Sequence, residues 1–277
     1  KLKPVFVDID IDTWCMSPES ILGSITISTK AIIVVHPYGN LCDMNKIMSI
    51  ANKYNLKVIE DAAEGFPSKY KHKISGTIGH IGTFSFQATK TITTGEGGMV
   101  CTNDSKLADK LELLRSHGFK YGKQREKHYW HELPGLNYRM TNIQAAMGCA
   151  QLEKINLIIE NKKKLTLLYT KYLESQKGIS LQKITKDVEP VLWAFAIKID
   201  TNYFLQGRDN LMSKLEGMGI ETRPGFYTPS SLEYFNCNEL ESSTKIAAST
   251  LVLPSYPELK ENEIEYVCQS LLSLRTI

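Results

Sequence analysis

The first part of the chain alternates short apolar runs with segments of helical periodicity. Strands are predicted over 4–9, 31–36 and 57–60, and helices from 17 onward and over 43–54. The run that begins at Ala31 is continuously apolar, which is typical of a parallel strand covered on both faces. Pro18 occupies a permitted first-turn position, and Asp43 is placed to cap its helix. This β-α-β-α-β order predicts a doubly wound or related α/β domain.

The later part of the chain continues with strands and helices, and after Gly178 their order is that of a small α+β domain. Further strands are predicted over 81–86, 98–102, 191–199 and 220–222, and helices over 104–117, 141–175, 208–218 and 261–274. The polar and aromatic segment 118–138 lacks periodicity and is interpreted as a long loop, a kind of segment that is usually functional or disordered. We expect a large domain over 1–160 and a small α+β domain over 161–277, with the boundary inside the long helix.

Composition narrows the class of protein. A chain of 277 residues can bury a full-sized core, and 42% hydrophobic with 23% charged residues is ordinary for a globular protein. The formal net charge of +3 is too small to indicate a nucleic-acid partner, and the lysines are spread along the chain. Their one cluster, Lys162–Lys164, is predicted to lie on a solvated helix face.

The cysteines, the hydropathy and the start of the chain each carry an expectation. Six cysteines stand far apart, without a CxxC pair or a His/Cys cluster: Cys15, Cys42, Cys101, Cys149, Cys237 and Cys268. This pattern favours a reduced, cytoplasmic chain without a metal site. No apolar run reaches the roughly 18 residues that span a membrane, so no membrane partner is expected. The sequence opens without Met on an apolar run, and we expect an upstream part of the fold to lie outside it.

Lys90 is the first candidate for chemistry. An isolated lysine is most often a solvated surface residue. Here an apolar run precedes it, and the Thr- and Gly-rich segment 91–98 follows it, which would let the backbone approach a ligand closely. A partly desolvated lysine in such a place is suited to forming an imine with an aldehyde.

Two carboxylates follow the predicted strand 57–60. Asp61 stands at the carboxyl end of that strand, where α/β sheets place their ligands, and Glu64 lies one helical turn further on. Asp61 is about equally well interpreted as a helix N-cap, and Glu64 as a first-turn carboxylate favoured by the helix dipole. Together with Lys90, they supply what pyridoxal phosphate needs: an amine for the aldehyde and an acid for the pyridine nitrogen.

Weaker candidates stand at other element ends. The Ser85 hydroxyl could donate to a phosphate oxygen, although most serines in such places bond to backbone. Asn137 and Arg139 precede the long helix and could form an anion site, but capping by Thr141 or Asn142 is the preferred interpretation from the residues alone. The sequence has no phosphate loop of the GxxxxGK[ST] type, no HExxH and no GxSxG motif, and the histidines lack metal-ligand spacing.

At these residues the chain resembles the pyridoxal-phosphate-dependent nucleotide-sugar aminotransferases of the DegT/StrS type, and within them the perosamine-synthase branch. The matching strings are 58–64 (VIEDAAE), 79–86 (GHIGTFSF), 90–100 (KTITTGEGGMV), 129–131 (YWH), 137–146 (NYRMTNIQAA), 220–224 (IETRP) and 253–257 (LPSYP). They extend over essentially the whole chain. Gln87-Ala88-Thr89 departs from the aromatic, Gly and Asn that this branch usually carries, so the local loop or the sugar preference is expected to differ.

The resemblance implies a fold and a set of roles. The fold would be that of aspartate aminotransferase (fold type I), an α/β fold with a large mixed-sheet domain, a small C-terminal α+β domain and active sites at a homodimer interface. Lys90 would be the Schiff-base lysine and proton shuttle, and Asp61 would pair with the pyridine nitrogen. Glu64 would lie beside the cofactor ring, Ser85 would hold its phosphate, and Asn137 would reach the phosphate in the neighbouring subunit. The segment expected upstream would supply a phosphate loop and a stacking aromatic.

The implied reaction is transamination. L-Glutamate would give its amino group, leaving 2-oxoglutarate, and a nucleotide-linked 4-keto-6-deoxyhexose would accept it at C4, in the synthesis of surface polysaccharides such as O-antigen. Relatives with His at the lysine position are dehydratases, so Lys90 points to amino transfer. Arg223 and Tyr227 are candidates for substrate contact, each equally interpretable as a surface or packing residue. The alternatives are a UDP- or dTDP-linked sugar, or a truncated non-catalytic paralogue that binds a sugar nucleotide or a partner subunit.

Overall fold

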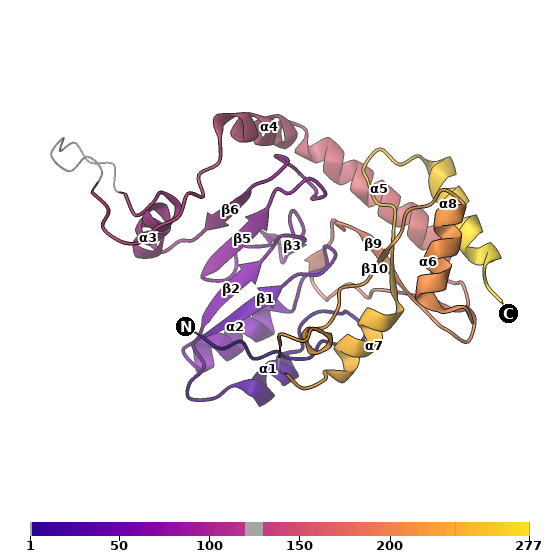
Figure 1. Ribbon diagram of the computed structural model, residues 1–277, viewed down its shortest axis with the longest axis horizontal. Helices are drawn as coiled ribbons and strands as arrows, with labels where there is room; N and C mark the ends of the chain where they lie inside the picture. Colours follow the sequence, from indigo (N-terminus) through magenta and orange to yellow (C-terminus); the bar gives the residue numbers. More distant parts are fainter. Residues whose placement is uncertain (1, 120–129, 236, 277) are drawn as a thin grey trace.

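The computed structural model describes residues 2–119, 130–235 and 237–276. Its first sheet consists of β1 (Ala31–Val35), β2 (Lys57–Asp61), β5 (Ile81–Ser85) and β6 (Gly98–Cys101), in the order β1-β2-β5-β6 (Figure 1). The first three strands are parallel, and β6 runs antiparallel to β5. This is the mixed sheet of the expected α/β fold. Because β1, β2 and β5 run the same way, their carboxyl ends meet at one edge.

Two helices pack on one face of this sheet. They are α1 (Pro18–Ser24) and α2 (Met44–Lys53), and the Asp43 carboxylate caps α2 as predicted, by accepting from the Lys46 N–H. Alternate β1 residues face these helices and are buried, but Ile33 and Val35 on the other face are 59% and 47% exposed. The prediction that β1 is covered on both faces is therefore wrong for the described chain, in which the side chains on its second face are about half exposed.

The predicted strand over 4–9 is also wrong. Only Ile9 pairs, through a single bridge with Met16, because no described strand lies alongside this segment to complete a ladder. Asp8 instead reaches across the chain, and its carboxylate accepts the N–H groups of Ser242 and Ser243. It thereby caps α7 (Glu241–Ser249), a helix that the periodicity did not predict.

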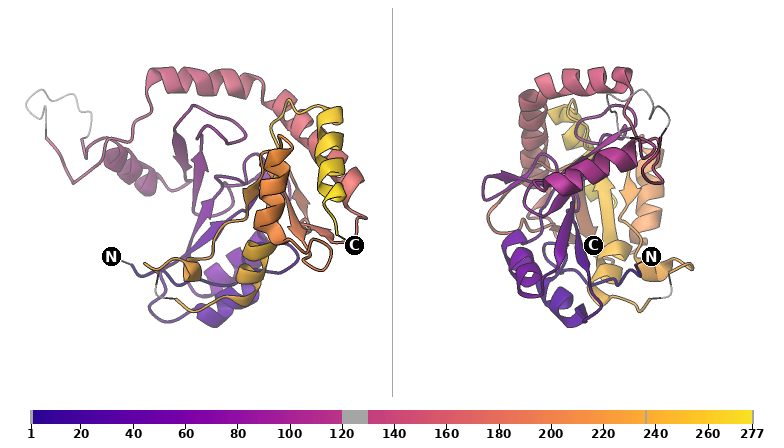
Figure 2. Two further views of the ribbon diagram at one scale, coloured as in Figure 1. Left: turned by 45° about the vertical axis from the view of Figure 1, so that its right-hand side comes forward. Right: turned by 90° about the vertical axis from the view of Figure 1, so that its left-hand side faces the viewer.

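The second sheet is antiparallel and forms the core of the C-terminal part of the chain. Its order is β10 (Arg223–Pro224), β11 (Thr250–Leu253), β9 (Phe195–Ile199) and β7 (Ile179–Leu181), and it packs with α5 (Ile155–Leu173), α6 (Gly207–Gly217) and α8 (Glu261–Ser273) (Figure 2). The strand predicted from 191 begins at Phe195. The strand predicted over 220–222 forms at 223–224 instead, since Ile220 packs into the core. The domain boundary near residue 160 remains a prediction.

The helix predicted over 141–175 is two helices. The chain turns at Lys154 (φ −102°, ψ 7°), which separates α4 (Asn142–Glu153) from α5, and the two follow one another along one side of the molecule (Figure 1). Thr141 caps α4 in a capping box with Gln144, in agreement with the simpler of the two interpretations. No residue of α4 is buried. In α5, by contrast, Lys162 is only 3% exposed, so its predicted place on a solvated face is wrong.

Smaller elements complete the described chain. Asp104 caps α3 (Ser105–Arg115), and a three-stranded sheet joins β3 (Lys69–Tyr70), β4 (Lys73–Ile74) and β8 (Val188–Glu189); a 3-10 turn, η2, covers Pro229–Ser231. The predicted loop 118–138 falls partly on 120–129, outside the described residues. Its flanks are tied together by single bridges, from Ser116 to Asn137 and from Phe119 to His131.

Candidate active site

Candidate side chains stand where two neighbouring parallel strands end. Asp61 is the last residue of β2 and Ser85 the last residue of β5, and the register pairs Asp61 with Thr83. The Asp61 carboxylate accepts the Ala63 N–H at 3.1 Å, and the Ser85 hydroxyl accepts the Gln87 N–H at 3.3 Å. Both polar groups therefore belong to one edge of the sheet, which is the place that α/β folds use for ligands.

Lys90 lies in a loop that is held together by its own backbone. The loop closes at its base, where Phe86 donates to the Gly97 carbonyl and accepts from the Thr94 N–H, each at 2.9 Å. Inside it, the Gln87 side chain accepts from both the N–H and the hydroxyl of Thr89, at 2.8 and 2.7 Å. The residues that depart from the perosamine-synthase pattern thus form a turn of their own. The Lys90 side chain that this turn presents is 15% exposed.

Glu64 is the carboxylate beside the lysine. Its Oε1 lies 3.4 Å from Lys90 Nζ, and its Oε2 accepts the Tyr38 N–H at 3.0 Å. Burial raises the pKa of Glu64, and the hydrogen bond from Tyr38 and the charge of Lys90 oppose that rise only in part. The nearby charge of Asp61 raises the pKa further. The structure therefore brings Lys90, Glu64 and Asp61 into one electrostatic neighbourhood.

Trp193 is a residue of this site that the sequence reading missed. Lys90 Nζ lies over the indole ring of Trp193, 4.2 Å from the ring centroid, and the Trp193 Nε1–H donates to the Thr89 carbonyl at 2.7 Å. The hydropathy pattern places Trp193 in an apolar run, and 103 residues of sequence separate it from the lysine. No local signal connects two residues at that distance.

Four residues form a closed ring of contacts. Lys90 contacts Glu64, Glu64 accepts from the Tyr38 N–H, the Tyr38 carbonyl accepts the Trp193 N–H at 2.9 Å, and the Trp193 ring returns to Lys90. Tyr38 is buried, and its backbone is left-handed (φ 58°), a conformation that non-glycine residues seldom adopt. Both peptide groups of Tyr38 are used in this ring, so the strained backbone has a definite task.

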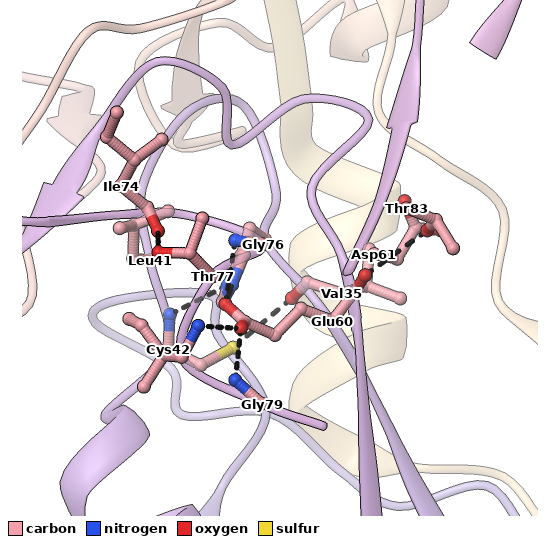
Figure 3. A network of polar contacts seen from close by, with 12 residues as sticks. Val35, Leu41, Cys42, Glu60, Asp61, Ile74, Gly76, Thr77, Gly79 and Thr83 are labelled. Atoms are coloured by element: carbon pink, nitrogen blue, oxygen red, sulfur yellow. Dashed lines mark hydrogen bonds and ion pairs between the residues drawn. The ribbon is translucent and has the colours of Figure 1, made fainter. Parts of the chain in front are cut away.

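A second buried network lies behind Asp61. The neighbouring side chain, Glu60, is fully buried, and its carboxylate accepts N–H groups of Gly76 (2.9 Å), Ile78 (2.6 Å) and Gly79, together with the His36 Nε2–H at 3.2 Å (Figure 3). Burial raises the pKa of Glu60, but the hydrogen bonds from His36 and the backbone outweigh it and hold the pKa below its usual range. Successive strand residues face opposite sides, so Glu60 braces the sheet while Asp61 faces the other way.

The remaining predicted residues are not gathered with these. Asn137 is exposed and pairs by a bridge with Ser116. Arg223, which forms an ion pair with Glu221 at 3.3 Å, lines a hollow of about 860 Å³ that Lys90 also lines. Tyr227 lines a separate hollow of about 330 Å³. The structure thus puts the two substrate-contact candidates in different hollows, and only Arg223 shares one with the lysine.

Within 2–119, 130–235 and 237–276, no group of three or more His, Cys, Asp or Glu side chains could hold a metal ion. No helix of the described chain is long and apolar enough to cross a membrane.

Comparison with known proteins identifies the family. The model of the DegT/DnrJ/EryC1/StrS aminotransferase family matches residues 1–272. The chain belongs to this family. It is 43% identical over 272 residues to a GDP-perosamine synthase of Escherichia coli O157:H7, an alignment that covers 97% of this chain and 72% of that protein. The resemblance inferred from the sequence motifs is thereby confirmed.

Solved structures agree with the fold. An aminotransferase of Helicobacter pylori involved in the biosynthesis of pseudoaminic acid superposes with a TM-score of 0.91 at 25% identity, over 98% of this chain and 73% of that one. An Escherichia coli GDP-4-keto-6-deoxy-D-mannose-3-dehydratase with bound hydrated PLP gives 0.87 at 28% identity, over 96% and 73%. The expected fold of pyridoxal-phosphate-dependent aminotransferases is confirmed.

The residues of the site fit this cofactor. Lys90 offers a primary amine to an aldehyde, and Asp61 and Ser85 offer an acid and a hydroxyl at one sheet edge. The Glu64 carboxylate lies beside the amine and accepts a hydrogen bond from Lys90 Nζ. The chain is a pyridoxal-phosphate-dependent aminotransferase.

Proposed function

We propose that the protein transfers an amino group from L-glutamate to C4 of a GDP-linked 4-keto-6-deoxyhexose, in the manner of a perosamine synthase. The identity of 43% with the Escherichia coli GDP-perosamine synthase supports this substrate. The reaction would take place in the cytoplasm and supply an amino sugar for surface polysaccharide such as O-antigen. The observation that carries the proposal is the lysine with its paired carboxylate: Lys90 Nζ stands 3.4 Å from Glu64.

Each residue has a task in this proposal. Pyridoxal phosphate, when bound, supplies an electron sink for the carbon that gains or loses the amine. Lys90 would hold the cofactor through its amine and, as a free amine, would carry the proton to and from the substrate carbon. Asp61 holds a proton at the pyridine nitrogen, Ser85 binds the phosphate, and Glu64 orients Lys90. Arg223 contacts the substrate from the hollow that it shares with Lys90, and Tyr227 contacts a more distant part of the substrate from its own hollow.

We also propose that the enzyme works as a homodimer with shared sites. In that arrangement Asn137 binds the phosphate of the cofactor in the neighbouring subunit. The position of Asn137 supports this role, because its side chain is exposed. The helix α4, none of whose residues is buried, begins five residues further along the chain, at Asn142.

The test is an assay of the complete protein with a panel of nucleotide-linked 4-keto sugars. GDP-, UDP- and dTDP-linked acceptors are each incubated with L-glutamate and pyridoxal phosphate, and products are identified by mass. We expect the amino sugar from the GDP-linked acceptor, absorbance of bound cofactor, and loss of both turnover and covalent cofactor in Lys90→Ala. Lys110→Ala, on the exposed side of α3, is the matched control. Full turnover in Lys90→Ala would refute the proposal, and preference for another nucleotide would correct its substrate.

A further inference from the structure

The Trp193 side chain holds the lysine loop at two points. Its indole N–H donates to the carbonyl of Thr89, and its ring face lies under Nζ of the next residue, Lys90. Trp193 lies beside the core instead of inside it, because its side chain is only partly buried. Its packing against this core cluster thus coexists with the indole N–H and the ring reaching Thr89 and Lys90.

The backbone of Trp193 is fixed from both sides. Its N–H donates to the Tyr38 carbonyl at 2.9 Å, and its carbonyl accepts from Lys162 Nζ at 2.6 Å. Lys162 also donates to the Ser255 carbonyl at 2.6 Å, and this amine is almost fully buried. The indole ring consequently starts from a backbone that has little freedom to shift, and its face meets Lys90 at a defined place.

We propose that Trp193 is a positioning residue for Lys90. The ring face of Trp193, together with the Glu64 carboxylate, holds the free amine of the lysine at a fixed point of the site. The inference rests on the proposed function, since that function requires Lys90 to be released and recaptured in each cycle. It goes beyond it by assigning the holding of the free amine to a residue from the C-terminal part of the chain.

The physical basis is the quadrupole of the indole ring. A cation within about 6 Å of the ring centroid is attracted to the negative face, and the attraction strengthens where water is excluded. Here the distance is 4.2 Å, and the lysine side chain is 15% exposed. An amine held against the ring face and the Glu64 carboxylate is less available to a reagent, so weakening the ring should make Lys90 more accessible to labelling. The expected change in the labelling rate is roughly two- to thirtyfold between the full ring interaction and its loss.

The test alters the electron density of the ring without altering its shape. Tryptophan carrying one, two and then three fluorine atoms is inserted at position 193 of the whole protein, because each fluorine weakens the negative face and leaves the indole N–H in place. Without cofactor, Lys90 is labelled with formaldehyde and cyanoborohydride at pH 7, and the methylation rate is followed by peptide mass. Lys110 in the same sample is the internal reference, and fluorination of the exposed Trp130 is the control.

We expect labelling of Lys90 to accelerate stepwise with fluorine number, while Lys110 and the Trp130 series stay constant. Trp193→Phe, which keeps a ring face and loses the N–H, should lie between the wild type and Trp193→Leu. A labelling rate that does not change across the fluorinated series would overturn the proposal, because a purely structural tryptophan would behave in that way. A graded response in a protein that transfers no amine would refute the proposed function alone.

Discussion

Glu60→Gln removes a buried charge and tests the network behind Asp61. The Glu60 carboxylate accepts four hydrogen bonds, two on each oxygen: Gly76 and His36 on one, Ile78 and Gly79 on the other. Glutamine has the same shape but only one acceptor oxygen. Its amide NH₂ must then face one of the two pairs of donors, and that pair loses its acceptor in a site without solvent access.

The magnitude follows from the two orphaned donors. A buried donor left without a partner costs about 1–3 kcal/mol, and breaking a buried charged interaction costs about 3–5 kcal/mol. We therefore expect Glu60→Gln to lower the free energy of unfolding by about 2–5 kcal/mol at pH 7. Since the pKa of Glu60 is held below its usual range, its contribution is present above the unfolded pKa and is lost as the pH falls through the folded value. The difference between variant and wild type should shrink on acidification.

The assay is chemical denaturation of the complete protein, monitored by circular dichroism at several pH values. Glu216→Gln, on an exposed position of α6, makes the same chemical change without a buried partner and should leave the midpoint unchanged. A loss below about 1 kcal/mol for Glu60→Gln, or a loss that is independent of pH, would refute the reasoning.

Three further outcomes are expected. Asp8→Ala should lower the free energy of unfolding by about 0.5–2 kcal/mol through loss of the cap on α7. Burial raises the pKa of Asp8, but hydrogen bonds led by that from Ser243 outweigh it and lower the pKa, so the loss should be largest above that pKa. Thermal melts at pH 3 and pH 7 check this. Burial lowers the pKa of Lys162 to about 8. Between pH 8 and about 10.5 only the unfolded chain binds the proton, so the wild type should gain stability relative to Lys162→Met as the pH rises through this range. Denaturation at several pH values across the range tests the sign of this change. Gly82→Ala should destabilise by about 3 kcal/mol or more, since its Cβ would clash with the backbone oxygen of Gly76, whereas Gly23→Ala has open space and should be neutral or stabilising in the same melts.

Local signals in the sequence were enough for most of the N-terminal sheet. Continuous apolar runs predicted β1, β2 and β5, and Asp43 predicted the cap of α2, because these depend on neighbours within a few residues. The strand predicted at 4–9 failed for a complementary reason. Its residues favour an extended chain, but a strand exists only where another strand pairs with it, and that is a property of the whole fold.

The candidate site divides in the same way. Lys90, Glu64 and Asp61 could be singled out because each stands at, or within a few residues after, the end of a strand that the sequence predicts. The motifs around these residues indicated the family, whereas the roles of the residues toward the cofactor remain predictions. Trp193 could not be found, since its contact with Lys90 depends on how two distant segments pack. The burial of Lys162 escaped for a related reason: a run of three lysines indicates solvent, and only the fold supplies carbonyls to receive one of them.

The outer rims of β1 and β6 have a practical consequence for handling the protein. Among the described residues, β1 and β6 are the two edge strands of the same sheet, and no strand pairs with their outer sides. The half-exposed side chains of Val35, Met99 and Val100 lie on these edge strands. Such rims recruit further strands from solution, so a concentrated sample of residues 1–277 should cluster unless something occupies them. Light scattering is the first measurement to make, because a clustered preparation would seem inert for reasons unrelated to its chemistry.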